Sequence, residues 1–508
     1  MLLGRMLDEV ALCSPQADAL WFKDRRWTFG ELKEWVDRLA GGLHQAGIGH
    51  GDRVAFFLPN CPELIFAYLA CFKLGAVCVP LNYRYLRAEA EYAIRHSGST
   101  SLLVHREKLS IANELPLDEL QVQQRYLVGG TDDVDGFASF HRLLAKPGES
   151  ATTRKFSEDS SCAILYTSGS TAKPKGVTYS HRTLYRNCDI QVKTGEFTAK
   201  DVHVVMTSVS HAAALSGQLL PNLLAGGTTV LLDRPTSADI LEAITRHHAT
   251  RIQMLPASLE DLLEHIEDHP TPLPSLKSCF VGGDSVPLDF HRRFEKYFGW
   301  QVSEVCGMTE CLTYSMNPPF GEKRIGSVGK PVRETVIRIV GDEGQDLPIG
   351  EVGEIWIKNP AVMVGYWNDP EATSKVLRAG CMASGDLGRL DPDGYLWFVG
   401  RKKEIIIRGG SNISPLEVEA VINEHPAVHL CGVVGKPDPH FGQVVVAFVA
   451  MRDNVSNPPS AEELRQFVAA RIASYKVPEQ FHFLDEMPLN PTGKVDRKQL
   501  HRWVESIS

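Results

Sequence analysis

The chain has 508 residues, of which 43% are hydrophobic and 23% are charged, as in an ordinary globular protein. This composition excludes a disordered, collagen-like or coiled-coil chain, and the length corresponds to roughly three or four structural units. The 53 lysines and arginines are outnumbered by 62 aspartates and glutamates, which gives a formal net charge of −9. Nucleic-acid binders usually carry excess positive charge, so we expect no nucleic-acid partner, and any anionic ligand must be held by a local patch.

Cysteine usage and the N-terminus indicate a cytoplasmic protein. The 11 cysteines are scattered and form no C-x-x-C pair, which is typical of buried thiols in a reducing compartment and offers no metal-ligand spacing. Asp8 and Glu9 lie where a signal peptide would be apolar, so we expect no secretion. The most apolar run, residues 64–81, contains a lysine, a glycine and a proline. It therefore predicts a buried helix followed by a strand, not a membrane span.

The N-terminal part of the chain alternates between strand-like and helical patterns. Short β-branched runs predict strands, and the stretch 62–75, with its early proline and terminal glycine, predicts a helix. A strand–helix–strand order implies parallel strands joined by crossover helices. We expect it for strands 53–58, 76–80 and 101–104 with helices 62–75 and 87–98, and again around strands 203–208, 228–232, 251–256 and 278–283.

After Ile325 the pattern changes to strands in quick succession, which predicts antiparallel β structure. These strands are expected at 334–340, 351–358 and 394–400, with turn signals at 341–344 and 368–372. Beyond Arg401 a compact α+β segment follows. Its predicted elements are strands 429–435 and 444–451 and helices 414–425 and 460–472, which begin at the N-cap residues Ser414 and Ser460.

We therefore predict an α/β protein with a large N-terminal body, a short hinge and a small mobile C-terminal domain. The body, residues 1–400, is expected to contain two α/β parallel-sheet subdomains and a β-barrel-like subdomain. The hinge is residues 401–403, and the α+β domain, residues 404–508, is called the lid below. Residues 401–508 contain 13 basic and 13 acidic residues, so the net charge of −9 belongs to the body.

The strongest local signal is the segment 161–181, in which an apolar strand runs into T-S-G-S-T and a second apolar stretch follows. Glycines allow the backbone to approach a ligand closely, hydroxyls and N–H groups can wrap a polyanion, and Lys173 and Lys175 can neutralise it. The segment differs from a Walker A loop because Pro174 and a strand follow where that motif opens a helix. It predicts a phosphate-holding loop between two strands, the alternative being a polar hairpin turn without a ligand.

Residues 166–177, YTSGSTAKPKGV, resemble the signature of the adenylate-forming (ANL) superfamily, which includes acyl- and aryl-CoA synthetases, nonribosomal-peptide adenylation domains and firefly luciferase. Ala172 stands where the family usually has glycine. Further segments resemble the remaining family motifs and occur in the family's order, which covers nearly the whole chain: 72–82, 280–287, 305–310, 384–386, 400–419 and 490–500.

The resemblance implies that ATP activates a carboxylic acid as an acyl-adenylate, with Mg²⁺ and release of pyrophosphate, before transfer to the thiol of CoA. It assigns the phosphates to one loop and the adenine to two others. The residues implied for the phosphates are Thr167, Ser168, Gly169, Ser170, Thr171 and Lys175, and those for the adenine are Gly282, Gly283, Asp284, Cys306, Gly307 and Met308. Position 306 often holds a stacking aromatic residue in the family, so the cysteine changes that contact.

Further roles are implied for residues around the phosphates and the ribose. Glu310, together with Thr167, is implied as a Mg²⁺ ligand, because hard cations prefer oxygen. Thr309 is expected to donate its hydroxyl to the α-phosphate. Asp386 is expected to accept from the ribose hydroxyls with Arg401 beside it, the alternative for Asp386 being a loop cap.

The lid is implied to alternate between two half-reactions. Lys494 is expected to bridge the acyl carboxylate and the α-phosphate during adenylation, since a mobile ammonium suits that role. Lys403 matches the hinge position, and Gly410 matches the residue on the path of the thiol, the alternative being a simple turn. His211 is expected beside the acyl and thiol channels, the alternative being a histidine that caps a helix.

The acid itself is constrained only in class. No aspartate lies between Met206 and Asp233, where relatives that activate amino acids hold the substrate ammonium, and burial of an unpaired ammonium is costly. Small residues at 212–217 leave volume for a medium-chain, branched or aromatic acid.

Transfer to CoA is the preferred interpretation, with the cations Arg401, Lys402, Lys403 and Arg408 expected to help hold it. The alternatives are a stand-alone adenylating enzyme that loads a carrier protein, and a non-catalytic binding protein. A luciferase-like side activity and homodimer formation are left open.

Overall fold

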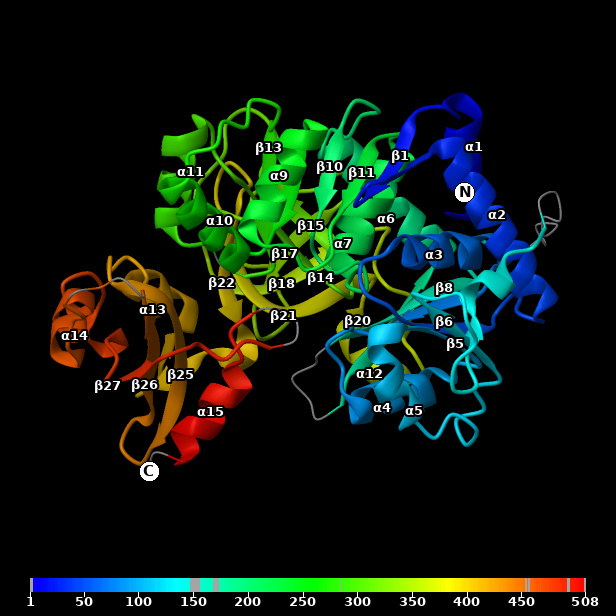
Figure 1. Cartoon of the computed structure of the whole chain (residues 1–508). Coiled ribbons are helices and arrows are strands. Elements are labelled where there is room, and N and C mark those ends of the chain that lie inside the picture. The colour runs from blue at the N-terminus through cyan, green and yellow to red at the C-terminus, as the bar shows by residue number, and fades with distance from the viewer. Residues whose placement is uncertain are drawn as a thin grey trace.

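The computed structural model describes residues 3–146, 156–167, 173–284, 286–452, 455, 457–490 and 494–506. In these ranges the chain forms four β-sheets with helices packed on them (Figure 1). Three sheets belong to the body. The fourth belongs to the lid, which Figure 1 shows as a separate lobe coloured orange to red. The predicted α/β class, with a large body and a small C-terminal domain, is confirmed.

The first sheet is built mainly from the N-terminal part of the chain and has the order β19-β9-β8-β4-β3-β5-β6-β7. Its central strands β8, β4, β3, β5 and β6 run parallel, whereas β9 is antiparallel to β8. The strands are β3 (Arg53–Phe57), β4 (Val77–Pro80), β5 (Ser101–His105), β6 (Gln124–Val128), β7 (Ala138–Ser139), β8 (Ser161–Thr167), β9 (Lys175–Ser180) and β19 (Gly365–Tyr366). Helices of this region are α1 (Leu3–Cys13), α2 (Phe29–Gln45), α3 (Pro62–Leu74), α4 (Arg87–Ser97) and α5 (Leu109–Asn113).

The second sheet has the order β16-β15-β14-β13-β12-β10-β11-β1-β2, with parallel pairing from β14 to β1. Its strands are β1 (Asp18–Phe22), β2 (Arg25–Thr28), β10 (Val202–Val205), β11 (Thr228–Leu231), β12 (Arg251–Met254), β13 (Ser278–Gly282), β14 (Ser303–Met308), β15 (Leu312–Met316) and β16 (Lys330–Pro331). The helices of this part of the chain are α6 (His181–Thr194), α7 (Ala212–Ala214), α8 (Leu220–Leu224), α9 (Ser237–His247), α10 (Pro256–Asp268) and α11 (Leu288–Phe298). The predicted strand–helix alternation is confirmed in both sheets.

The third sheet is antiparallel, as predicted, and comprises β17 (Val336–Val340), β18 (Gly353–Lys358), β20 (Leu377–Arg378), β21 (Cys381–Leu390) and β22 (Leu396–Arg401). The predicted turn at 368–372 is wrong in part, because α12 (Pro370–Val376) begins there. Asp369 accepts a hydrogen bond from the backbone N–H of Ala372, and Pro370 occupies the first turn, so the same residues that signal a turn also start a helix.

The lid contains its own five-stranded sheet of β23 (Ile406–Arg408), β24 (Ser411–Ile413), β25 (Val428–Asp438), β26 (Gly442–Met451) and β27 (Gln480–Leu484). Its helices are α13 (Pro415–Ile422), α14 (Ala461–Ala469) and α15 (Arg497–Ser506). The predicted N-caps are confirmed, because the side chains of Ser414 and Ser460 accept from the backbone N–H groups of Glu417 and Glu463. Helix α14 ends three residues earlier than predicted.

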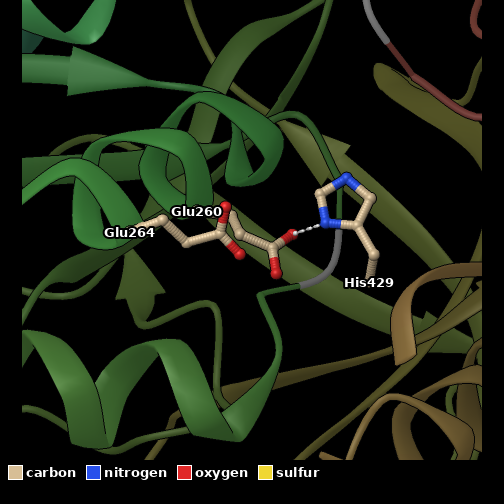
Figure 2. Close-up of side chains that lie close together, drawn as sticks. All are labelled: Glu260, Glu264 and His429. Carbon is tan, nitrogen blue, oxygen red and sulfur yellow. Dashed lines mark ion pairs between the residues drawn. The ribbon is translucent and has the colours of Figure 1, made fainter. Parts of the chain in front are cut away.

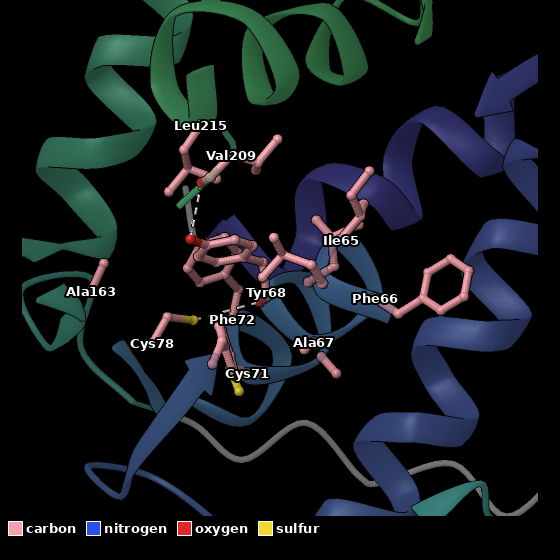
Figure 3. Close-up of a cluster of buried hydrophobic side chains, with 14 of the residues drawn as sticks. Ile65, Phe66, Ala67, Tyr68, Cys71, Phe72, Cys78, Ala163, Val209 and Leu215 are labelled. Atoms are coloured by element: carbon pink, nitrogen blue, oxygen red, sulfur yellow. Dashed lines mark hydrogen bonds between the residues drawn. The ribbon is translucent and has the colours of Figure 1, made fainter. Parts of the chain in front are cut away.

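Helix α3 explains the long apolar run near the N-terminus, because it is buried between the first sheet, helices α1 and α2, and the segment that contains Val209 and Leu215 (Figure 3). The Tyr68 hydroxyl donates to the backbone oxygen of Val209 at 3.1 Å. The one charged residue near the helix end, Lys73, is neutralised by Asp8 and Asp37. No helix among the described residues combines the length and apolar character needed to span a bilayer.

A buried ion pair at the base of the second sheet provides a stability test. Arg251 is 1% exposed, lies 3.0 Å from the Asp201 carboxylate, and donates to two backbone oxygens. We expect Arg251→Met to lower the free energy of unfolding by about 3–5 kcal/mol, because it leaves Asp201 without its cation. Arg246→Met, which removes an exposed pair with Asp24, should cost less than about 1 kcal/mol. Chemical and thermal denaturation of both variants checks this, and equal losses would contradict it.

Candidate functional site

The predicted phosphate loop connects two antiparallel strands, as expected. Thr167 ends β8 and pairs directly with Lys175, which begins β9, so these two predicted residues flank the mouth of the hairpin. Four further predicted residues lie outside the described residues: Ser168, Gly169, Ser170 and Thr171. The hairpin therefore presents a hydroxyl and an ammonium opposite each other, at the end where the loop connects the two strands.

The turn after β14 carries the next two predicted residues, Thr309 and Glu310, and its backbone is held from two sides. Tyr179 of β9 donates its hydroxyl to the backbone oxygen of Thr309, and the N–H of Met363 donates to the backbone oxygen of Glu310 at 2.8 Å. The side chain of Glu310 is also held, because its Oε1 accepts from the hydroxyl of Tyr366 at 2.8 Å. The carboxylate thus has a defined orientation.

Tyr366 contacts both Glu310 and Lys175, and the sequence patterns did not predict it as a site residue. It lies on β19, whose pairing with β9 sets it opposite Val177, and the Lys175 ammonium lies 4.7 Å from the centre of its ring. Burial and the nearby charge of Glu310 raise the pKa of Tyr366, so it stays a hydrogen-bond donor. No local pattern indicates this role, because it depends on a pairing between strands almost 190 positions apart.

A pocket of about 390 Å³ opens next to Lys175 and Tyr366. Two lysines and several aromatic rings share it, a combination that suits anionic groups. The lining residues are Tyr92, His96, Lys173, Pro174, Lys175, Gly176, Tyr366, Trp367 and Asp369.

Gly282 and Gly283 are placed at the end of β13 for two different reasons. A Cβ on Gly282 would lie 2.2 Å from the backbone oxygen of Val305, so glycine is required for the contact with β14. Gly283 has a φ of +95°. A Cβ on it would lie 3.6 Å from Cε and 4.0 Å from Nζ of Lys494. The lid lysine therefore reaches the strand end that was predicted to flank the adenine.

Lys494 is held in an environment of mixed charge. Burial lowers its pKa, the negative charges of Asp284 and Asp386 oppose this, and Arg401 lowers it further. Close to it in the chain, Nη2 of Arg497 donates to both carboxylate oxygens of the buried Glu419, at 2.8 Å to Oε1 and 2.7 Å to Oε2. Arg497 also lies 3.5 Å from Glu404, so the segment that carries Lys494 is tied to the residue after the predicted hinge. No local pattern in the sequence indicates the pair of Arg497 and Glu419, which are 78 positions apart.

Asp386 and Arg401 face each other across β21 and β22, with 3.6 Å between the carboxylate oxygen and Nε. Asp386 is buried, and burial raises its pKa to about 6 although Arg401 and Lys494 act in the opposite direction. Glu310 contributes to the same shift, so these predicted residues share one electrostatic neighbourhood.

Cys306, Gly307 and Met308 form the end of β14. A Cβ on Gly307 would lie 2.6 Å from the backbone oxygen of Leu312, which explains the glycine. The Sγ of Cys306 lies 3.0 Å from the hydroxyl of the buried Tyr314, and burial raises the pKa of the thiol to about 12. The cysteine is thus a neutral, partly buried surface at the position where the family often has an aromatic ring.

His211 is the N-cap residue of the short helix α7, as the alternative expects, but its side chain makes no capping hydrogen bond. Burial lowers its pKa to about 4, and the charges of Arg84 and Lys494 act in the same direction. The imidazole is therefore neutral near pH 7. A π-helical turn, Leu215–Leu219, follows, a feature often found at functional sites.

The hinge and the predicted thiol path lie on the lid side of the site. Lys403 is exposed in the short helical segment 402–404. Gly410 lies in the turn between β23 and β24 with a φ of +80°, and no atom lies within 4 Å of the position of a Cβ on it. Both observations fit the predicted roles, and for Gly410 they fit the simple turn equally well.

Three of the four cations expected to help hold CoA make ion pairs with carboxylates in this structure. Lys402 lies 2.9 Å from the Asp342 carboxylate, and Arg408 forms an ion pair with Glu479. Arg401 faces Asp386, as described above. These carboxylates come from distant parts of the chain, so a local count of positive charges overestimates the free charge.

The raised pKa of Asp386 predicts a gain in stability on its neutralisation. Because the folded pKa of about 6 exceeds the ordinary aspartate value of 3.8, stability is greatest below about pH 4 and falls as the pH rises through 6. We expect Asp386→Asn to raise the free energy of unfolding at pH 7.5 by about 1–3 kcal/mol. Thermal midpoints between pH 4.5 and 8 check this, since the difference should shrink toward low pH. A difference that is independent of pH would contradict it.

Comparison with known proteins assigns the chain to a family. Residues 7–367 match the family model of the AMP-binding enzymes, and residues 417–494 match that of the AMP-binding enzyme C-terminal domain. A feruloyl-CoA synthase of Amycolatopsis sp is 35% identical over 495 residues, which are 97% of each chain. An indoleacetate–CoA ligase of Aromatoleum aromaticum is 32% identical over 511 residues, 99% of this chain and 98% of the relative.

A solved structure extends the similarity to three dimensions. The crystal structure of the anthranilate CoA ligase AuaEII in complex with anthranoyl-AMP has a TM-score of 0.92 and 25% identity, covering 99% of this chain and 97% of that chain. The sequence motifs, the convergence of their residues and these similarities agree. The chain belongs to the AMP-binding enzyme family, on the acyl- and aryl-CoA synthetase branch of the adenylate-forming superfamily.

Proposed function

We propose that this enzyme is an ATP-dependent acid–thiol ligase that converts a carboxylic acid into an acyl-adenylate and pyrophosphate, and then forms acyl-CoA and AMP. The observation that carries the proposal is the position of Lys494. It belongs to the lid, yet it lies against Gly283 of the body and is close enough to Asp284 and Asp386 to feel their charge. This position supports the proposal because the lysine lies beside the segments that we assign to the nucleotide.

In the first step, a carboxylate oxygen of the acid attacks the α-phosphorus of ATP. The new P–O bond forms as the bond to the bridging oxygen breaks, and that electron pair leaves with pyrophosphate. We assign Lys494 to neutralise the acyl carboxylate and the α-phosphate, which otherwise repel each other. Thr309 donates to the α-phosphate, and Lys175 with the loop after Thr167 holds the leaving phosphates.

The oxygen donors of Glu310 and Thr167 fit a hard divalent cation, and the hydroxyl of Tyr366 holds Oε1 of Glu310 at 2.8 Å. We assign these residues to Mg²⁺, which when bound would neutralise the charge of the phosphates. Tyr366 keeps the carboxylate oriented. The hydroxyl of Tyr366 donates to Glu310, so we do not assign it as a ligand of Mg²⁺.

The nucleoside is assigned to the two strand ends and the β21–β22 pair. Asp386 accepts from the ribose hydroxyls, and Arg401 lies beside it toward the phosphate. The adenine lies along residues 282–284 and 306–308. Cys306 offers it a small neutral contact, so we expect less stacking energy here than an aromatic ring would supply.

In the second step, the lid rotates about the hinge 401–403 and the thiol of CoA attacks the acyl carbon. The C–S bond forms, the C–O bond to the adenylate breaks, AMP leaves with the electron pair, and the thiol proton is released to solvent. Gly410 leaves the thiol path open because it has no side chain. The neutral His211 lies beside this path and can accept a hydrogen bond from the thiol.

An aromatic acid is the substrate class we favour among medium-chain, branched and aromatic acids. The small residues 212–214 and Gly217 leave room, and a Cβ on Gly217 would still be 3.8 Å from the nearest other atom, in Gln253. The absence of aspartate from 207–232 argues against an amino acid. The relatives described above are named for feruloyl, indoleacetate and anthranilate substrates.

A second candidate is transfer of the acyl group to the phosphopantetheine of a carrier protein. It is favoured by one observation, the neutralisation of Lys402 and Arg408 by carboxylates, which removes part of the charge expected to hold the phosphates of CoA. Both candidates share the same adenylation step and differ only in the thiol.

Pyrophosphate release with a panel of acids tests the proposal. With ATP and Mg²⁺, we expect release with ferulate, indoleacetate or anthranilate, at least tenfold faster than with an α-amino acid, and conversion of CoA to a thioester. Release without consumption of CoA would favour a carrier protein. No release with any acid would contradict the adenylation step and leave a binding protein.

Lys494→Ala tests the assigned role of the lid lysine. We expect adenylation to slow by a factor of about 100 or more, because the repulsion between carboxylate and α-phosphate is no longer offset. Thioester formation from a supplied acyl-adenylate should be largely unchanged. Lys498→Ala, at an exposed lysine four positions further on, is the control and should leave both steps unchanged. Equal losses in both half-reactions would reject the assignment.

A further inference from the structure

A second charged cluster lies where the lid meets the body, away from the nucleotide segments. Glu260 and Glu264 come from α10 of the body, whereas His429 and Arg452 come from the lid (Figure 2 shows the first three). Nη2 of Arg452 lies 2.8 Å from Oε1 of Glu260, and Arg452 also pairs with Glu264. Nδ1 of His429 lies 3.5 Å from Oε2 of Glu260. We call these four residues the interdomain cluster.

Regular secondary structure places both halves of the interdomain cluster. Glu260 and Glu264 are four positions apart on a helix, so they share one face and project toward the lid. On the lid, Val428 of β25 pairs with Met451 of β26. His429 is the second residue of β25 and Arg452 directly follows β26, so both lie at this end of the strand pair. The N–H of Arg452 donates to the backbone oxygen of Ala427 at 3.1 Å and holds that end closed.

The guanidinium of Arg452 argues against a metal at the interdomain cluster. The ligand atoms of Glu260, Glu264 and His429 lie within 4.8 Å of one another, a spacing that a cation could bridge. Arg452 already contacts both carboxylates, however, and supplies the positive charge there. The cluster is therefore a set of ion pairs across the interface.

Burial makes the ion pairs sensitive to the orientation of the lid. Glu260 is only 2% exposed in this orientation, and a buried carboxylate that loses its cation is strongly destabilised. If the lid rotated away, the same carboxylate would meet water and no cation would be required. Loss of Arg452 therefore penalises the orientation seen here and not the rotated one, which shifts the population between the two.

We propose that Glu260, Arg452 and His429 are positioning residues that hold the lid where Lys494 reaches Gly283, so that the enzyme is biased toward adenylation. The inference rests on the proposed two-step function, because it assigns the cluster to one of the two lid orientations. It goes beyond that function by naming the contacts that set the balance between them. In this structure, the contact of Lys494 with Gly283 and the ion pair of Arg452 with Glu260 are present at the same time.

The histidine adds a dependence on pH. Its hydrogen bond and charge interaction with Glu260 raise the pKa of His429, with Glu264 adding to the effect and burial and the nearby charge of Arg452 opposing it. Asp261, whose own pKa is raised by burial, also interacts with His429. A raised pKa means that the pair stabilises this orientation below the usual value of about 6.5 and loses its effect as the pH rises through the raised pKa. Alkaline pH should therefore favour the rotated lid.

Single-turnover rates of the two half-reactions test the proposal, with the panel acid that gives the highest rate and its acyl-adenylate. We expect Arg452→Met to slow adenylation at least tenfold with little change in KM for ATP, and to leave thioester formation unchanged or faster. The double variant Glu260→Gln with Arg452→Met should recover most of the adenylation rate, because no charge is then buried alone. The control is Arg471→Met, which removes a lid arginine paired 3.6 Å away with Glu424 of the lid itself.

Four outcomes separate the inference from the function on which it rests. Unchanged adenylation in Arg452→Met, or equal losses in both half-reactions with a lowered thermal midpoint, would overturn the inference. His429→Gln should remove the pH dependence of the ratio between the two rates above pH 6.5, and a dependence unaltered by that variant would count against the histidine's part. Failure of the unaltered enzyme to form any acyl-adenylate would refute the proposed function instead.

Discussion

The site depends on the balance between buried carboxylates and cations that come from elsewhere in the chain. Asp386 is buried enough for its pKa to rise to about 6, and Glu310 contributes to that shift. The compensating charges come from Arg401, next to the predicted hinge, and Lys494 on the lid. In the proposed function, the electrostatics of the nucleotide site therefore depend on the orientation of the lid.

Charge distribution therefore matters more than net charge in this protein. The body carries the whole net charge of −9, while residues 401–508 are neutral overall. The cations of the lid segment are divided among separate tasks, since Arg497 supports the lysine segment, Arg408 pairs within the lid and Arg452 contacts the body. In the proposed function, these separately placed cations allow a protein with an acidic body to bind a polyanion.

Sequence patterns predicted most of the fold, for local physical reasons. The helix at 62–74, the caps at Ser414 and Ser460 and the hairpin around the phosphate loop all depend on residues close in the chain. Two features differ from what the local patterns indicate. The turn at 368–372 is also a helix start, and the cations Lys402 and Arg408 meet carboxylates from distant positions.

Residue identity and spacing were sufficient to predict the α/β class, the large body with a small C-terminal domain and the two strands that flank the loop, because periodicity and capping act over a few residues. Tertiary structure alone decided that Tyr366 holds Glu310, that Arg497 supports the segment of Lys494 and that Arg452 joins lid to body. The physical reason is that burial and partner charges set the strength of these contacts. Both depend on which distant segments the fold brings together.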